Sequence, residues 1–107
     1  MSDGVVLIAR AQLRAECRDE AISWLERIQS GSRSEPDCLT YNVHIGADDP
    51  EMLIFYEAWK DQDAFQSHLD SPAFAEFMQG KERYIDGEVK IINLTCVNRM
   101  NMERSGR

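Results

Sequence analysis

Three stretches within residues 5–59 have the hydrophobic patterns of β-strands, in which every second side chain lies on the same face. Residues 5–14 begin with apolar residues on both faces and then alternate, so that one face consists of Val5, Leu7, Ala9, Ala11 and Leu13. Residues 38–45 alternate throughout, with Leu39, Tyr41, Val43 and Ile45 on one face and Cys38, Thr40, Asn42 and His44 on the other. Residues 52–59, MLIFYEAW, are rich in β-branched and aromatic side chains. Because only residues 46–51 separate the last two stretches, we expect an antiparallel hairpin.

Other segments have the periodicity of amphipathic helices. Residues 15–30 place Cys17, Ala21, Trp24, Leu25 and Ile28 at helical spacing, and the following SGSRSEPD is expected to end this helix. Asp61 or Asp63 can cap a short helix at residues 64–69, and Ser71-Pro72 starts another with serine as N-cap. That helix places Phe74, Phe77, Met78 and Ile85 on one side. Gly87 is expected to end it, and residues 88–97, EVKIINLTCV, to form a fourth strand.

The predicted order β-α-β-β-α-β is that of the ferredoxin-like fold, an α+β arrangement with two helices on one face of a four-stranded antiparallel sheet. We assign residues 1–98 to this single domain and residues 99–107 to a polar C-terminal tail. The second face of the sheet is partly apolar, since Val6, Ile8, Ile92 and Leu94 lie on it or near it. A large exposed apolar face indicates a partner, so we expect a homodimer that forms through the sheet faces.

Composition narrows the class of protein. The 107 residues carry a net charge of −7, which argues against partners such as nucleic acid or an anionic membrane surface. The three cysteines, Cys17, Cys38 and Cys96, lack a paired spacing, and we interpret them as reduced thiols. The N-terminal apolar run is too short to span a membrane and has no basic region before it. We therefore expect a cytoplasmic protein.

His68 is the best candidate for a catalytic residue. Imidazole exchanges protons near neutral pH, which suits removal of a proton from a phenol or an acidic carbon. The residue follows Phe65 by three positions and precedes Leu69, which places it at the edge of the buried face of a predicted helix. The alternative is a half-buried histidine whose polar group is satisfied by one backbone carbonyl. Both interpretations stay open at this point.

Two further sets of side chains are candidates for binding a substrate. Asn42 and His44 share a strand face and could donate or accept hydrogen bonds with a carbonyl-bearing ligand, or could instead face solvent or a dimer partner. Aromatic residues concentrate between the third strand and the helix after it. Phe55, Trp59 and Phe74 could form a flat slot for an aromatic substrate, or this cluster could simply be core packing. The histidines and carboxylates lack a recognisable metal-ligand spacing, so we expect no metal site.

The segments EPDCLTYNVH and IFYEAWKDQDAFQSHLDSPAF, together with the element order and the apolar last strand, resemble the antibiotic biosynthesis monooxygenase family. The resemblance covers nearly the whole chain and is densest at Glu57, Trp59 and the AFQSHLDSPAF segment that follows. It implies a dimeric α/β barrel. The family includes cofactor-independent monooxygenases, quinone-forming enzymes, haem-degrading monooxygenases and an isomerase of a phosphorylated signal molecule.

Differences from these subgroups narrow what the resemblance implies. Haem-degrading members have an iron-ligating histidine ten residues after a tryptophan, and the corresponding positions here are Met78 and His68, which argues against haem. Phe55 stands where polyketide-type members commonly have asparagine. Ala73 stands where quinol-linked and isomerase members tend to have a second histidine. His68 is retained, and no subgroup fits fully.

The resulting expectation is a cofactor-independent monooxygenase that acts on a small aromatic or quinol-type substrate. In such a reaction the deprotonated substrate itself gives an electron to O₂, and the protein binds the anion, excludes water and supplies a base. We therefore expect no cofactor. Two alternatives stay open: a cofactor-free isomerase of a small dicarbonyl or sugar-phosphate-derived substrate, and a non-enzymatic small-molecule-binding stress protein. Analogy of fold alone does not choose among them.

Overall fold

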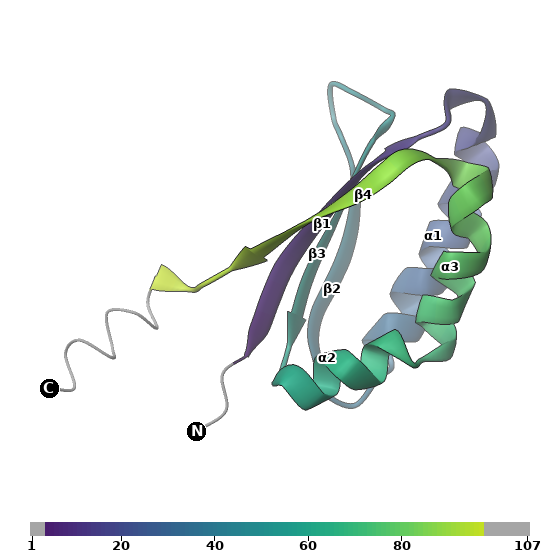
Figure 1. Ribbon diagram of the computed structural model, residues 1–107. Helices are drawn as coiled ribbons and strands as arrows, with labels where there is room; N and C mark the ends of the chain where they lie inside the picture. Colours follow the sequence, from purple (N-terminus) through teal and green to yellow (C-terminus); the bar gives the residue numbers. More distant parts are fainter. Residues whose placement is uncertain (1–3, 98–107) are drawn as a thin grey trace, which may run out of the picture.

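The computed structural model describes residues 4–97, which form the predicted succession of strands and helices (Figure 1). The strands are β1 (Val5–Leu13), β2 (Cys38–Ile45), β3 (Met52–Trp59) and β4 (Ile85–Leu94). The helices are α1 (Arg18–Arg33), α2 (Gln62–Leu69) and α3 (Pro72–Tyr84), with a 3₁₀ turn, η1 (Ala15–Cys17), before α1. No helix within residues 4–97 has the length and apolar character needed to span a membrane. The predicted tail at residues 99–107 lies outside the described residues.

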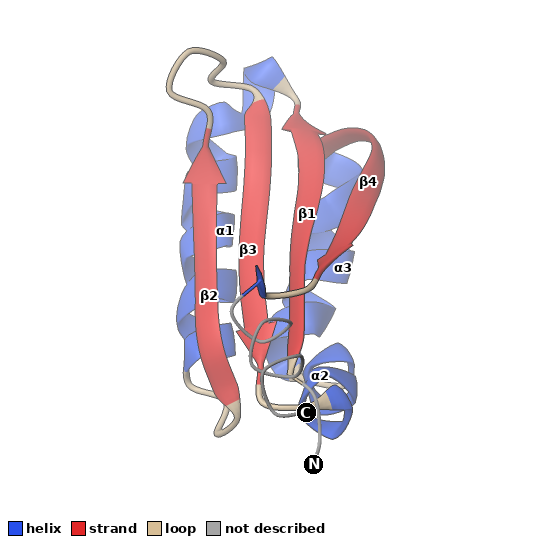
Figure 2. Ribbon diagram, turned by 90° about the vertical axis from the view of Figure 1, so that its left-hand side faces the viewer, coloured by secondary structure: helices blue, strands red, loops and turns tan. Residues whose placement is uncertain are grey.

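The four strands form one antiparallel sheet in the order β2-β3-β1-β4. All helices lie on one side of this sheet, as Figure 1 shows edge-on, and Figure 2 looks onto the face that they leave uncovered. β2 and β3 form the expected hairpin, in which Ile45 pairs with Leu53. The ferredoxin-like α+β fold predicted from the sequence is confirmed.

The core lies between the sheet and the helices, and α1 and α3 meet over it. The predicted inward face of β1 is buried from Leu7 to Leu13. From α1, the buried Trp24 donates a hydrogen bond from Nε1 to the Glu76 carbonyl oxygen on α3, at 2.9 Å. A Cβ atom at Gly80 would lie 2.2 Å from Trp24 Nε1, so the glycine allows this close approach of the two helices.

Two capped turns fix the path of the chain after β3, and thereby the position of α2 and α3. The Asp61 carboxylate accepts a hydrogen bond from the Ala64 amide at 2.8 Å, which caps α2. The Ser71 hydroxyl accepts one from the Phe74 amide at 3.2 Å, and Pro72 occupies the first position of α3. The sequence predicted the Ser71 cap and named Asp61 as one of two candidates for the other. As a result, α2 crosses one end of the sheet (Figure 1). His68 of α2 packs there against Trp59 and Tyr41 of the sheet.

Helix α1 ends later than predicted, because it runs through the SGSR segment to Arg33 instead of ending where SGSRSEPD begins. A Cβ atom at Gly31 would lie 3.2 Å from the Cβ of Ala73 on α3, and Ser32 is fully buried. Packing of the last turn of α1 against its neighbours therefore outweighs the weak helix propensity of glycine and serine. The helix ends shortly before Pro36, which cannot continue it.

The second boundary that differs is that between α3 and β4. Ile85, predicted on the buried side of a helix, is instead the first residue of β4 and pairs with Leu13 of β1. Gly87 does not end a helix: it lies within β4 with a φ of 82°, close to the place where the β1–β4 register shifts. A glycine tolerates this left-handed conformation, which is typical of a β-bulge. Met78, predicted to face the core, is half exposed.

The start of β2 departs from simple alternation. The register between β2 and β3 shifts between Cys38 and Thr40. Leu39, predicted to share the inward face of Tyr41, is 66% exposed as a result, whereas Cys38 packs against the core. From Tyr41 onwards the alternation follows the prediction, with Val43 and Ile45 packed against the core.

Candidate active site

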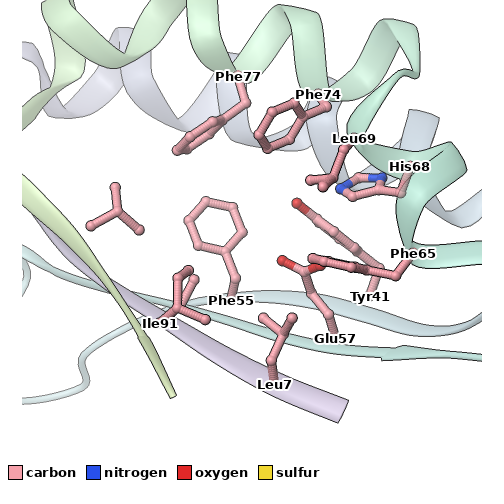
Figure 3. Close-up of a pocket in the computed structure, with 12 residues that line it drawn as sticks. Leu7, Tyr41, Phe55, Glu57, Phe65, His68, Leu69, Phe74, Phe77 and Ile91 are labelled. Atoms are coloured by element: carbon pink, nitrogen blue, oxygen red, sulfur yellow. The ribbon is translucent and has the colours of Figure 1, made fainter. Parts of the chain in front are cut away.

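A cavity of about 220 Å³ lies between the inner face of the sheet and helices α2 and α3 (Figure 3). Most of its walls are apolar, and they are formed by Leu7, Ala9, Phe55, Phe65, Leu69, Phe74, Phe77, Val89 and Ile91. Three lining residues carry polar groups: Tyr41, Glu57 and His68. An apolar cavity of about 150 Å³ holds benzene. The cavity described here therefore has room for one aromatic ring with small substituents.

His68 reaches the cavity from α2 and is only 2% exposed. Its Nδ1 lies 3.2 Å from both carboxylate oxygens of Glu35, a residue of the loop between α1 and β2. Because a carboxylate accepts hydrogen bonds and cannot donate them, the proton of the neutral imidazole belongs on Nδ1. The lone pair is then on Nε2, which is the arrangement of a general base held by an orienting carboxylate.

Aromatic packing holds the plane of the His68 ring. The ring stacks on Trp59, with centroids 4.4 Å apart and an interplanar angle of 30°. Phe74 meets it edge-on at 5.7 Å, and Tyr41 lies 5.6 Å away. Trp59 itself is 1% exposed and is not among the residues that line the cavity. We conclude that Trp59 supports the imidazole from behind.

Glu57 is a buried carboxyl group on β3, at an inward position between Phe55 and Trp59. Its Oε1 accepts a hydrogen bond from Trp59 Nε1 at 3.0 Å, and the carboxyl group points into the cavity (Figure 3). Burial raises the pKa of Glu57, and the nearby charge of Glu35 adds to the effect. The hydrogen bond from Trp59 and the proximity of His68 lower the pKa without cancelling the rise. Glu57 therefore keeps its proton to a higher pH than an exposed glutamate.

Tyr41 reaches the cavity from β2, and its hydroxyl group points into the open space (Figure 3). Burial raises the pKa of Tyr41 far above its ordinary value, and the charge of Glu57 adds to this rise. The residue consequently stays a neutral phenol that can donate a hydrogen bond to a ligand.

The structure brings together part of the site predicted from the sequence. His68, Phe55 and Phe74 all line the cavity, and Trp59 lies directly behind it. Asn42 and His44 do not line it. They occupy the positions of β2 that alternate with the inward-facing Tyr41 and Val43. Asn42 Oδ1 accepts a hydrogen bond from Arg33 Nη2 at 2.7 Å, and His44 is exposed. Among residues 4–97, no three His, Cys, Asp or Glu side chains are grouped to hold a metal ion.

The sequence prediction missed the acidic groups and the tyrosine of this site. Glu57 had a detectable signal, because a charged residue at an inward strand position, flanked by two aromatic residues of the same face, requires a buried partner. Tyr41 likewise carries a polar group at an inward position of β2. Glu35 had none, since it lies in a loop and contacts a residue 33 positions away.

The sequence model of the antibiotic biosynthesis monooxygenase family matches residues 4–80, and the chain belongs to this family. The match includes β1 to β3, α2 and most of α3, and thus His68, Glu57 and the loop that carries Glu35. The family resemblance predicted from the sequence is confirmed.

Curated relatives are distant. An uncharacterized protein of Synechocystis sp., sll1783, is 26% identical over 77 residues, which are 72% of this chain and 52% of that protein. The chain thus spans about half the length of this relative. "Putative monooxygenase Rv0793" of Mycobacterium tuberculosis is 27% identical over 77 residues, which are 72% of this chain and 75% of that protein.

Solved structures share the fold over most of their length. PA3566 from Pseudomonas aeruginosa superimposes with a TM-score of 0.82 at 28% identity, covering 91% of this chain and 97% of the other. Rv0793 from Mycobacterium tuberculosis superimposes with a TM-score of 0.80 at 22% identity, covering 89% and 96%. The arrangement of sheet and helices is therefore that of the family.

Proposed function

We propose that the protein is a cofactor-independent monooxygenase of small monocyclic phenols or quinols. The observation that carries the proposal is a buried histidine, oriented by Glu35, at the wall of an apolar cavity with room for one substituted ring. Membership of the monooxygenase family and the name of the relative Rv0793 support the reaction class. His68 is the base in this proposal, and Glu35 is a positioning residue.

The first step is removal of the phenolic proton by His68 Nε2. The imidazolium that forms donates a hydrogen bond from Nδ1–H to Glu35, and the carboxylate stabilises the new positive charge. Phe55 and Phe74 form apolar walls around the substrate anion and keep water from it. An electron-rich phenolate in such an environment is a better electron donor than the neutral phenol.

The phenolate then passes one electron to O₂, and the two radicals join through a C–O bond at a ring carbon ortho or para to the phenolic oxygen. The peroxide that forms takes a proton from the His68 imidazolium, which regenerates the base. His68 next removes the hydrogen of the same ring carbon as a proton, the O–O bond breaks, and the departing hydroxide takes up that proton. One phenol and one O₂ thus give one quinone and one water.

The cavity favours this substrate class over a sugar phosphate. None of the described residues that line it is a lysine or an arginine, so a phosphate group would be buried without a cation. The alternative of an isomerase acting on a phosphorylated substrate is therefore less well supported than oxygenation of an uncharged ring.

We further propose that two copies pair through their uncovered sheet faces. Val6 pairs with Leu94, and Ile8 with Ile92, so these side chains form a contiguous apolar stripe across β1 and β4. Ile92 and Leu94 are 42% and 38% exposed, which is unusual for isoleucine and leucine in a sheet. Covering this stripe with a second copy would remove it from water.

Oxygen uptake tests the proposed function. The purified protein is supplied with a panel of monocyclic phenols and hydroquinones, and oxygen is followed with an electrode. Replacement of His68 by glutamine should lower turnover by about 10²- to 10⁴-fold, the usual contribution of a general base. His44→Asn is the matched control, because this histidine is exposed and does not line the cavity, and it should leave turnover unchanged.

Two results would overturn the proposal. A flat oxygen trace with the whole panel would exclude oxygenation of these substrates. A His68→Gln variant that folds, as judged by its melting temperature, and retains full turnover would exclude His68 as the base. Tight binding of a phenol without oxygen uptake would favour the non-enzymatic binding protein instead.

A further inference from the structure

Glu57 is a polar group of the cavity for which the proposed reaction has no role. It is 7% exposed, and its carboxyl group points into the space where the substrate ring would lie (Figure 3). Burying a charge there without a cationic partner is costly, so a carboxyl group kept at this position needs an explanation. Glu57 reaches the cavity from the sheet, whereas His68 reaches it from α2.

The hydrogen bond from Trp59 shows where the proton of a neutral Glu57 lies. The indole N–H can only donate, and it donates to Oε1 at 3.0 Å. Oε1 is therefore the carbonyl-like oxygen of the protonated group, and the proton belongs on Oε2. A proton on Oε2 is a hydrogen-bond donor available to a ligand in the cavity.

The groups around Glu57 set the pH range in which it can donate. Glu35 from the α1–β2 loop, Cys38 and Tyr41 from β2, and His68 from α2 all lie close enough to interact with its charge. Burial and Glu35 raise the pKa of Glu57, whereas His68 lowers it, and the net direction is upward. The donor is present at acidic pH and is lost as the pH rises through the raised pKa.

We propose that Glu57 is a specificity-determining acid that donates a hydrogen bond from Oε2 to a second oxygen of the substrate. The site then prefers phenols that carry an additional acceptor oxygen, such as hydroxyaryl ketones and quinols, over alkylphenols of the same size. The inference rests on the proposed function, because it takes a phenol as the ligand. A second acceptor oxygen is then the feature by which this cavity distinguishes one phenol from another.

Calorimetric binding of matched probes tests this preference without any turnover. The probes are 3- and 4-hydroxyacetophenone, each compared with the ethylphenol of the same substitution, which has the same shape but lacks the carbonyl oxygen. At acidic pH the wild type should bind at least one ketone about 5- to 10-fold more tightly than its ethylphenol, the value of a neutral hydrogen bond. Raising the pH should remove the preference.

Two variants separate hydrogen bonding from shape. Glu57→Gln keeps an oxygen for Trp59 and offers an amide N–H to the ligand at every pH, so it should retain the preference where the wild type loses it. Glu57→Leu should lose the preference at every pH. Glu82→Gln, at an exposed position of α3, is the control and should behave as the wild type.

Equal binding of ketones and ethylphenols by the wild type at acidic pH would overturn the inference, as would a preference that survives in Glu57→Leu. Should Glu57→Leu fail to fold, the pH series of the wild type against Glu57→Gln decides alone, and parallel curves would overturn it. A clear preference in a protein that consumes no oxygen would support the inference while refuting the proposed monooxygenase. Oxygen uptake together with equal binding of ketones and ethylphenols would support the proposed monooxygenase while refuting the inference about Glu57.

Discussion

Replacing Glu57 by glutamine allows the protonation of this buried carboxyl group to be measured. The readout is how the difference in unfolding free energy between the two proteins changes with pH. Glutamine has nearly the same shape and retains an oxygen that can accept the 3.0 Å hydrogen bond from Trp59 Nε1. It does not titrate. The difference in stability between the wild type and Glu57→Gln therefore isolates the free energy of ionising Glu57 inside the protein.

The sign of the pH dependence follows from the raised pKa of Glu57. The folded protein holds this proton to a higher pH than the unfolded chain, so the contribution to stability is fully present below the ordinary pKa of glutamate. It is lost as the pH rises through the raised pKa of the folded state. The wild type should consequently lose stability relative to Glu57→Gln with increasing pH.

The magnitude scales with the rise in pKa. Each pKa unit corresponds to about 1.4 kcal/mol of unfolding free energy. For a domain of this size, a change of about 1 kcal/mol moves the melting temperature by roughly 4–8 °C. One unit is thus worth roughly 6–11 °C, which is far above the error of a thermal melt.

Melting curves of the two proteins, recorded in steps from about pH 4 to pH 8, provide the assay. Subtracting the two series cancels the titrating groups that do not interact with Glu57. Groups that do interact with its charge, such as Glu35 and His68, contribute to the difference together with Glu57. Glu82→Gln, which removes an exposed carboxylate, should run nearly parallel to the wild type. Parallel curves for the wild type and Glu57→Gln would refute the reasoning, since the folded protein would then bind no additional proton at Glu57.

Three other substitutions test separate parts of the structure. Glu35→Gln should lower kcat by less than His68→Gln does, with KM little changed, because Glu35 contacts the base and not the substrate; a wild-type kcat would contradict this role. The wild type should elute as the proposed dimer and Ile92→Lys as a monomer in size-exclusion chromatography; a monomeric wild type would refute the dimer, and a persistent dimer would place the interface elsewhere. Gly80→Ala should destabilise the protein by about 1–3 kcal/mol in denaturant unfolding, because its Cβ would clash with Trp24; the stabilisation usual for glycine to alanine in a helix would refute this packing.

The fold could be predicted from local signals wherever the chain obeys a simple period or carries a cap. Alternation predicted β1 and β2, residue types predicted β3, and the caps at Asp61 and Ser71 indicated the starts of α2 and α3. The boundaries that differed depend on contacts distant in the sequence. Helix α1 passes through Gly31 because it packs on Ala73 of α3, and no local pattern contains that contact.

The candidate site could be predicted only in part, for a related reason. His68 and Phe74 were found from residue type and family resemblance, and both line the cavity. Asn42 was a candidate for ligand binding, with solvent or a dimer partner as the alternative, and it does not line the cavity because it alternates with the inward-facing Tyr41. The Glu35 partner of His68 depends on how a loop meets a helix, which is decided by the tertiary structure alone.

Isotope labelling tests the central claim, monooxygenation of a phenol at the cavity of His68, most directly. The substrate is the phenol that supports the fastest oxygen uptake, and the reaction runs under oxygen-18 gas. The product is analysed by mass spectrometry within about one minute of mixing. A parallel reaction in labelled water is the control for exchange. The account predicts a quinone that carries a single oxygen-18 atom, the other atom of O₂ leaving as water, and none of this product with His68→Gln. A product without label from the gas, or a labelled product formed equally by the variant, would contradict it.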